Sequence, residues 1–250
     1  MEHYYIDNGL LENYWQGQRR VKMLARDYSG FLVKENQRKK IQKSGVKVRP
    51  CICISRNIGV GALEIAGALG EMLNLPVLDR EIIKKISCSA DLSRQSIETF
   101  DERYPGKLKE LMCQVLGERI FGMNDYTRHL FYVSFFIAHS ESVIFVGRGI
   151  HLILPRDQVL AIRFVSSRNR RVKRMASTLN ADEKEASRLL SQAEKEQQAF
   201  FRLVHGKTKA PSKEFDAIMN LEYINPPEVA ARAISELFKS RFPDAECFAS

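Results

Sequence analysis

The chain has 250 residues, of which 44% are hydrophobic and 28% are charged, a balance typical of globular proteins and not of disordered chains. Its longest apolar run, residues 130–138, is about half of the roughly 20 residues that a membrane span needs, so no membrane partner is predicted. The first residues lack the basic and then apolar pattern of a secretory signal. Because the five cysteines are also scattered, a cytoplasmic location is predicted.

The net charge of +9 is concentrated near the start of the chain. Residues 1–50 contain eleven Lys and Arg against five Asp and Glu, which gives +6 and leaves +3 for the other 200 residues. We interpret residues 1–45 as a basic arm, either a solvated tether or a surface for an acidic partner such as nucleic acid. The tether is favoured, and a nucleic-acid partner is disfavoured, because the arm contains no recognisable nucleic-acid motif.

From Val46 onward, strand patterns alternate with helix patterns. Strands are predicted at 46–55, 75–79, 142–147, 159–167 and 215–220. Helices are predicted at 61–73, 80–86, 167–179, 182–204 and 226–240, and residues 91–139 are expected to be helical and irregular. This alternation predicts an α/β fold, with a parallel sheet covered by helices on both faces.

Two glycines join the first predicted strand to the helix that follows it. Gly59 and Gly61 let the backbone turn tightly and approach an anion, and the helix start offers free N–H groups to it. The common phosphate-binding loop reads G-x-x-x-x-G-K-[ST], whereas Ala62 occupies the lysine position here. Glycines in this place are also often structural, so the loop alone is a weak signal of nucleotide binding.

Several segments together strengthen this signal. "ISRNIGVGALEIAGALGEMLNLPVLDREII" is followed in order by "SVIFVGRGIHLILP", "IRFVSSRNRRVKRM" and "FDAIMN". In this combination the chain resembles the cytidylate kinase-like family of P-loop nucleotide kinases, whose first motif typically reads S-R-x-x-G-S-G-G-R-E-I. The family pattern lacks the lysine too. This chain departs further, because Val60, Ala62 and Leu63 stand where Ser, Gly and Arg are usual.

The resemblance implies one kinase-like domain over residues 46–245. Within it, residues 87–139 are expected to form a helical insertion on the acceptor side, and residues 168–206 a lid segment with its following helix. ATP and Mg²⁺ are the implied cofactors, and a nucleotide is the implied substrate. The residues expected to bind the ATP are Ser55, Arg56, Gly59, Gly61, Ala62 and Leu63 in the loop and Asn220 at the adenine end, although Asn220 could instead only close a turn.

On the acceptor side, the resemblance implies roles for Asp79, Arg80 and Arg148. Asp79 could hold Mg²⁺ through water or orient the acceptor, or it could simply cap the helix after it. Arg148 lies in "VGRG", at the end of a buried strand, where its guanidinium could bind a phosphate or a base edge. The alternative for Arg148 is a structural pair with a carboxylate. A cytidylate kinase has G-R-D here, so Gly149 weakens a prediction of cytidine specificity.

Six basic residues and no acidic one lie between Arg163 and Arg174. At helical spacing, Arg168, Arg171 and Arg174 fall near one face, and the resemblance implies that they close over the donor phosphates. For Arg170 and Lys173 a solvated face is favoured. The family's D-x-x-R pattern in the next helix is occupied by Glu194 and Gln197, so one lid arginine is missing.

The favoured function is therefore an enzyme, a nucleotide kinase that transfers a phosphoryl group from ATP to a nucleoside monophosphate or similar small acceptor. The alternative is a catalytically inactive nucleotide-binding or sensor protein on the same fold, which Ala62, Leu63 and Gln197 favour. A nucleic-acid surface made of the arm and the lid is the third hypothesis. The histidines and cysteines have no spacing that predicts a metal site.

Overall fold

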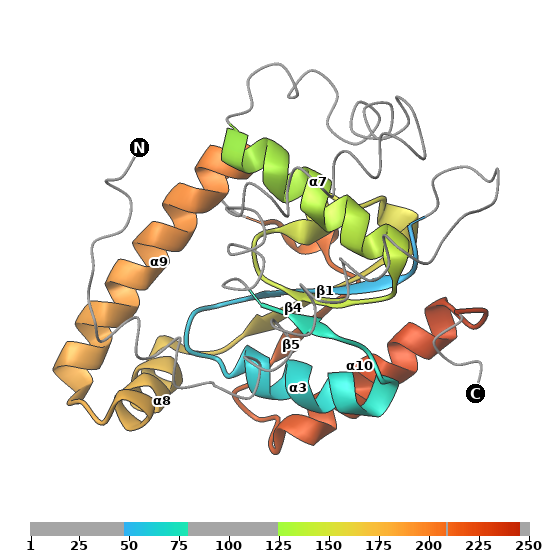
Figure 1. The fold of residues 1–250 in the computed structure, drawn as a ribbon. Helices are drawn as coiled ribbons and strands as arrows, with labels where there is room; N and C mark the ends of the chain where they lie inside the picture. The colour runs from blue at the N-terminus through green and yellow to red at the C-terminus, as the bar shows by residue number, and fades with distance from the viewer. Residues whose placement is uncertain (1–47, 80–124, 209, 246–250) are drawn as a thin grey trace.

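The computed structural model describes residues 48–79, 125–208 and 210–245. Its centre is a five-stranded sheet in the order β2-β3-β1-β4-β5, in which every neighbouring pair is parallel (Figure 1). The strands are β1 (Cys51–Arg56), β2 (Val77–Leu78), β3 (Ile144–Val146), β4 (Val159–Val165) and β5 (Ala217–Asn220). Since β1 lies in the middle, the residues that follow it have neighbours from the strands on both sides.

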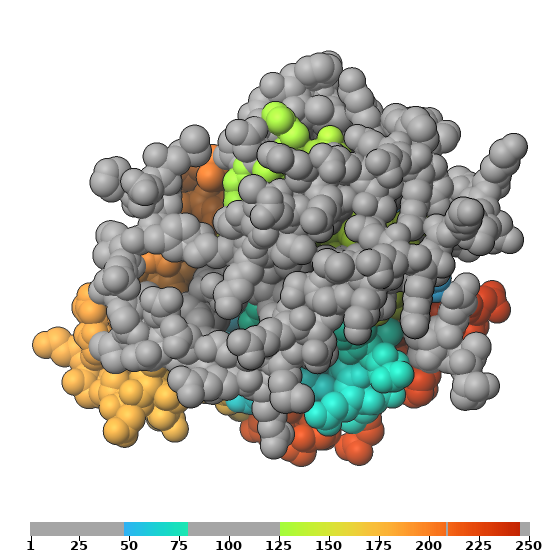
Figure 2. All heavy atoms as spheres, in the orientation of Figure 1, coloured from blue at the N-terminus to red at the C-terminus, as the bar shows by residue number. Residues whose placement is uncertain are grey.

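Helices cover both faces of this sheet, because β1 is apolar on both of its faces. Cys51 and Cys53 pack into the core shared with α7 (Asp125–Ser140). Ile52 and Ile54 pack on the other side, in the core shared with α3 (Ala62–Leu73) and α10 (Pro227–Arg241). Figure 1 shows α7 on one side of the sheet and α3 and α10 on the other, and the atoms of α3 and α10 meet at the lower edge of Figure 2. Successive side chains of a strand point to opposite faces of the sheet, and this alternation produces the layering.

Two more helices stand beyond the carboxyl ends of β1 and β4 (Figure 1). They are α8 (Arg168–Leu179) and the long α9 (Glu183–His205), which pack on one another around a small core of their own. Ile58, from the loop after β1, belongs to this core. Short 3-10 turns follow β3 (Ile150–Leu152) and precede β4 (Arg156–Gln158) and β5 (Ser212–Glu214). The ligand-binding edge of a parallel sheet is thus lined by α8 and α9.

The predicted elements that fall within the described residues are found, with shorter strands than predicted. The first strand begins at Cys51, not at 46, because Pro50 has no N–H to donate to a neighbouring strand. The strand predicted at 142–147 is reduced to three residues, and the one at 215–220 begins at Ala217. The helical part of 91–139 is described only as α7, from Asp125. The arm 1–45, the helix 80–86 and residues 87–124 lie outside the described residues.

Within the described ranges, no helix is both long enough and apolar enough to cross a membrane.

Candidate functional site

The loop between β1 and α3 has the backbone of an anion-binding turn. Gly59 and Gly61 have φ of +85° and +84°, a left-handed conformation that glycine adopts without strain. Gly61 is the N-cap of α3 and provides no side-chain hydrogen bond to the helix start. The first N–H groups of α3 therefore lack a side-chain cap, as an anion site at a helix N-terminus requires.

The side chains around this turn differ from those of a common phosphate-binding loop. Ala62 is buried at the start of α3, and Leu63 packs against the core shared with α3 and α10. Arg56 is buried at the end of β1, while Ser55 is half-buried one residue earlier. Ala62 and Leu63 can thus bind a phosphate only through their backbone N–H groups.

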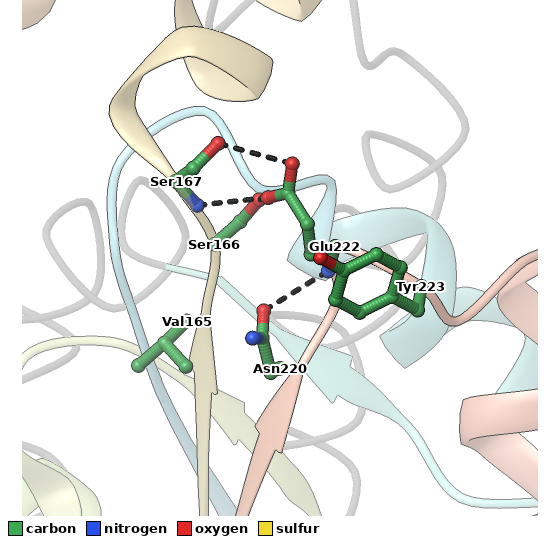
Figure 3. A pocket seen from close by; sticks show the side chains of 6 residues that line it. All are labelled: Val165, Ser166, Ser167, Asn220, Glu222 and Tyr223. Atoms are coloured by element: carbon green, nitrogen blue, oxygen red, sulfur yellow. Dashed lines mark hydrogen bonds between the residues drawn. The ribbon is translucent and has the colours of Figure 1, made fainter.

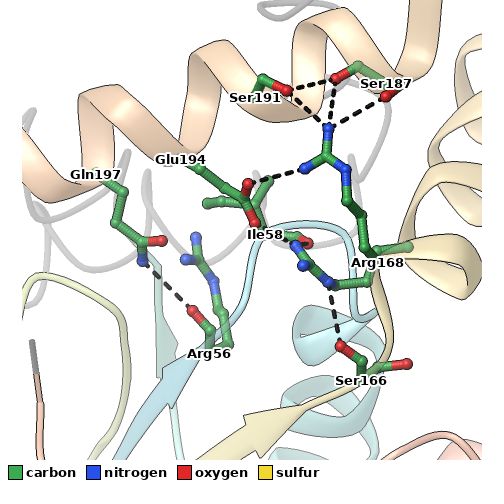
Figure 4. A network of polar contacts seen from close by, with 9 residues as sticks. Arg56, Ile58, Ser166, Arg168, Ser187, Ser191, Glu194 and Gln197 are labelled. Carbon is green, nitrogen blue, oxygen red and sulfur yellow. Dashed lines mark hydrogen bonds and ion pairs between the residues drawn. The ribbon is translucent and has the colours of Figure 1, made fainter. Parts of the chain in front are cut away.

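Three cations of α8 approach the loop, and carboxylates neutralise each of them. The Arg171 guanidinium is buried beneath the loop, where its Nη1 donates to the Ile58 carbonyl (3.2 Å) and to Glu194 Oε1 (2.5 Å). Arg168 is exposed and shares the same carboxylate through Oε2 (3.2 Å). Figure 4 shows Arg168 and Glu194 meeting between α8 and α9. Glu194 thus holds two cations that would otherwise repel one another.

Arg174 lies at the other end of the loop and pairs with Glu64 in the first turn of α3. A Cβ added to Gly61 would lie 2.9 Å from the Arg174 Cζ, so the guanidinium covers the loop backbone directly. Arg170 was expected on a solvated face, but its guanidinium donates to the Glu222 carbonyl. Lys173 is exposed, as expected.

The loop after β3 places Arg148 between the end of β1 and α9. The Gly147 N–H donates to the Ile54 carbonyl (2.9 Å), so the end of β3 is tied to the end of β1. Arg148 has φ of +55°, and its Cζ lies 4.2 Å from the centroid of the Phe200 ring. Its carbonyl accepts a hydrogen bond from His205 Nε2 (2.8 Å). Of the described residues, no carboxylate pairs with Arg148, and its Nε is buried without a hydrogen-bond partner.

A second buried histidine lies next to this loop. His151 packs against the Phe215 ring (4.9 Å between centroids), and its Nε2 lies 3.7 Å from Glu214 Oε2. Burial lowers the pKa of His151 to about 4, although Glu214 opposes this shift. The imidazole is therefore neutral at physiological pH and serves as packing beneath the Arg148 loop.

The ends of β4 and β5 border a surface hollow of about 390 Å³ (Figure 3). Glu222 links the two strand ends by accepting hydrogen bonds from Ser166 Oγ (2.8 Å) and from the N–H of Ser167 (3.0 Å). The hydrogen bond from the Ser167 N–H, joined by those from both serine hydroxyls, lowers the pKa of Glu222. Asn220 Oδ1 accepts a hydrogen bond from the Glu222 N–H (3.0 Å). Asn220 therefore closes a turn, which is one of the two roles that the sequence left open for it.

Asp79 follows β2 at the same edge of the sheet and is half-buried. Among the described residues, Asp79 does not belong to any cluster of three or more acidic, histidine or cysteine side chains that could bind a metal ion. Mg²⁺ in nucleotide sites needs only one or two carboxylates besides the phosphate oxygens, so Asp79 fits that need. Arg80 lies outside the described residues.

Sequence reasoning missed Glu64, Phe200, His205 and Glu222. All four lie far from their partners in the sequence: Glu64 is 110 residues from Arg174, His205 is 57 and Phe200 is 52 (200 − 148) residues from Arg148, and Glu222 is 56 residues from Ser166. A helical plot of α9 could have drawn attention to Phe200 and His205, since both continue the face that carries Glu194 and Gln197. No local pattern points to the loop that they contact.

A model of the cytidylate kinase-like family matches residues 51–223, which include β1 to β5 and the glycine turn. The chain belongs to the cytidylate kinase-like family. The match begins at β1, in agreement with a resemblance that leaves out the arm.

One of three similar solved structures supports this fold. An uncharacterized protein from Eubacterium ventriosum has 19% identity and a TM-score of 0.59, with 77% of this chain and 99% of that chain covered. Shikimate kinase from Bacteroides thetaiotaomicron has 16% identity and a TM-score of 0.38, with 76% of this chain and 98% of that chain covered. Dephospho-CoA kinase from Campylobacter jejuni has 15% identity and a TM-score of 0.33, with 77% of this chain and 97% of that chain covered. The last two TM-scores are low, and neither likeness bears on the site. No curated protein matches the chain.

The predicted fold class, an α/β P-loop kinase-like parallel sheet with helices on both faces, is confirmed. In this member of the cytidylate kinase-like family, the expected D-x-x-R position contains Gln197, whose Nε2 donates to the Arg56 carbonyl (3.4 Å). Figure 4 shows this contact beside Glu194. The amide thus ties α9 to the end of β1, where an arginine would bring a further cation.

Proposed function

We propose that the chain is an ATP-dependent kinase that transfers the γ-phosphoryl group to a nucleoside monophosphate or a similar small acceptor. The family membership supports a nucleotide kinase-like role. The observation that carries the proposal is Arg148, a half-buried guanidinium with an unpartnered Nε and no carboxylate pair in the described part of the chain. A cation left in this state at the carboxyl edge of a parallel sheet is suited to an anionic ligand.

The glycine turn and the start of α3 are proposed to form the donor site. Backbone N–H groups at Gly61, Ala62 and Leu63 would hold the phosphates of ATP, with the helix dipole adding to the attraction. Arg174 is proposed to supply the charge that the common loop takes from its lysine, because its guanidinium already covers Gly61. Ser55 and Arg56 complete the loop.

The lid arginines are proposed to stabilise the transferred group. Phosphoryl transfer depends on holding two substrates in line and on cations around the developing charge. Arg168 and Arg171 stand at the donor side, with Glu194 keeping them in place. Mg²⁺ would be held by Asp79 together with the phosphate oxygens, and when bound it neutralises charge on the β- and γ-phosphates.

The donor base is proposed to occupy the hollow between the ends of β4 and β5. Ser166, Ser167, Asn220 and Tyr223 line this hollow, and its volume of about 390 Å³ lies within the range of small-molecule pockets. The Tyr223 side chain is highly exposed beside it and offers an aromatic face for stacking. Asn220 would act there mainly by shaping the turn.

The test is transfer of label from γ-labelled ATP, with Mg²⁺, to a panel of nucleoside monophosphates and nucleosides. We expect one acceptor to gain label, and Arg148→Ala to lower kcat/KM by about 100-fold or more, the loss found when one transition-state contact is removed. Arg188→Ala is the matched control, because Arg188 is exposed and, among the described residues, pairs only with its helical neighbour Glu185. It should retain full activity.

The second candidate is a nucleotide-binding or sensor protein without turnover. Three observations favour it: Ala62 is buried, Leu63 packs into the core, and Gln197 is engaged with a backbone carbonyl. Folded protein that binds ATP but labels no acceptor in the panel would support this candidate and contradict the kinase. The cytoplasmic location and the role of the basic arm stay predictions of the sequence.

A further inference from the structure

We propose that Phe200 and His205 are positioning residues that hold Arg148 ready for the phosphate group of the acceptor. This inference rests on the proposed function, since it gives Phe200 and His205 a task in binding the acceptor. Both residues lie on α9, the helix whose earlier turns contact the donor-side arginines. One helix would therefore support both halves of the site.

The first contact fixes the guanidinium. The Arg148 Cζ lies 4.2 Å from the centroid of the half-buried Phe200 ring, within the range of a cation–π interaction. Such a contact orients the flat guanidinium without occupying its N–H groups. Those groups stay available for an anion, and the buried Nε has no other partner among the described residues.

The second contact fixes the backbone. Arg148 adopts φ of +55°, a left-handed conformation that residues with a Cβ rarely adopt. Its carbonyl can only accept, so the 2.8 Å contact requires that His205 Nε2 carries the proton. The Phe201 ring, 4.7 Å away between centroids, packs on the imidazole. The buried His205 thus holds a peptide conformation that would otherwise relax.

Gly149 leaves the space that this arrangement needs. A Cβ at Gly149 would lie 2.4 Å from His205 Nε2, which no real structure allows. The residue after Arg148 must therefore be glycine for His205 to reach the Arg148 carbonyl. This gives the G-R-G sequence a physical role that a turn requirement alone does not explain.

The same helix connects these contacts to the donor side. Glu194 pairs with Arg168 and Arg171, and eleven residues later His205 holds Arg148. At 1.5 Å per residue the two contacts are about 16 Å apart along α9. A continuous helix transmits position over that distance, because its hydrogen bonds keep its residues in register.

The experiment separates positioning from folding by using conservative pairs. Phe200→Leu should raise the KM for the acceptor by about 3- to 30-fold, the range expected from loss of a cation–π contact, with the KM for ATP unchanged. Phe200→Tyr, which retains the aromatic ring, should have the same KM for the acceptor as the unmodified protein. His205→Ala should behave like Phe200→Leu, and His205→Gln, which retains an N–H at that reach, should recover part of the loss. Leu203→Ala, at an exposed position on α9, is the control.

A second measurement does not depend on turnover. The Nε–H proton of Arg148, assigned in the NMR spectrum by its loss in Arg148→Lys, should be shifted upfield by the Phe200 ring and should move to an ordinary position in Phe200→Leu. This result in a protein that labels no acceptor would keep the positioning role and reject the kinase. An unshifted proton, or label transfer with an acceptor KM unchanged or lowered in Phe200→Leu and His205→Ala, would overturn the positioning role.

Discussion

Gly61 is the residue at which the glycine turn meets α8. It has φ of +84°, and any Cβ there would press on the guanidinium of Arg174 at 2.9 Å. Two separate requirements, one for backbone conformation and one for space, thus fall on one position. They explain why glycine is needed here even though the neighbouring Ala62 and Leu63 depart from the family pattern.

Gly61→Ala tests this requirement. A left-handed alanine costs about 1–2 kcal/mol, and the displaced Arg174 should weaken ATP binding by about 10-fold. Urea unfolding and calorimetric titration with ATP measure the two effects. Gly67→Ala is the control, because a Cβ at Gly67, inside α3, would meet nothing within 4 Å. It should gain about 0.5–1 kcal/mol of stability. Unchanged ATP affinity in Gly61→Ala would show that Arg174 does not take part in donor binding.

At the scale of elements, α8 and α9 form a hairpin in which one carboxylate of α9 is shared by two arginines of α8, while Arg174 pairs with Glu64 outside the hairpin. Both helices begin with a side-chain cap, from Ser167 Oγ and from an Asp182 carboxylate oxygen. Their apolar faces form a separate core with Ile58. The basic residues of α8 would repel one another, so a carboxylate from α9 must lie between them. Glu194 is that carboxylate.

Glu194→Gln should destabilise the protein by about 2–4 kcal/mol, because it leaves the buried Arg171 guanidinium without its counter-charge. Chemical denaturation gives the free energy of unfolding. Glu185→Gln, which removes an exposed pair on the same helix, should cost far less, because water screens that pair. An equal decrease in the free energy of unfolding in both variants would show that Glu194 stabilises the hairpin no more than an exposed ion pair does.

At the scale of the whole molecule, the titration of buried groups sets the pH range of stability. Burial lowers the pKa of His151 from 6.5 to about 4. Between these two pKa values the unfolded chain binds a proton at this histidine and the folded protein does not. The free energy of unfolding therefore decreases as pH falls from about 6.5 towards 4. The full loss is about 3 kcal/mol, and about 2 kcal/mol of it falls between pH 7 and pH 5.

The carboxylates act in a lower window. Partial burial tends to raise the pKa of Asp216, but hydrogen bonds from Arg156, the Ala161 N–H and Arg241 outweigh it and lower the pKa. The pKa of Glu222 is lowered as well. Stability from these groups is present above their unfolded pKa near 4 and is lost as pH falls further. Of these three groups, His151 is the one that titrates between pH 7 and pH 5.

We expect His151→Gln to reduce the change in the free energy of unfolding between pH 7 and pH 5 by about 2 kcal/mol. Denaturation curves at the two pH values measure it. His129→Gln, on the half-buried side of α7, controls for the loss of one histidine. A pH dependence that survives in His151→Gln would place the responsible group elsewhere.

Local sequence patterns were enough to predict the α/β architecture. The alternation of apolar strands with amphipathic helices, the glycines after "CICIS" and the basic helix after β4 are all local features, because hydrophobic period and turn chemistry act over a few residues. They located β1, α3, α8, α9 and α10 to within a few residues. Strand ends were less well predicted, since pairing with a neighbour decides where a strand stops.

The site depended on contacts between distant segments. Arg171, Arg174 and Arg148 were recognisable as cations, but the sequence could not show that Glu194, Glu64 and Phe200 are their partners. Nor could it show that His205 reaches the carbonyl of a residue 57 positions earlier. Side chains that meet in this way share no pattern along the chain, because only the packing of α8 and α9 across the sheet edge brings them together. The sequence thus identified the cations of the site, whereas the tertiary structure decided which residues they pair with.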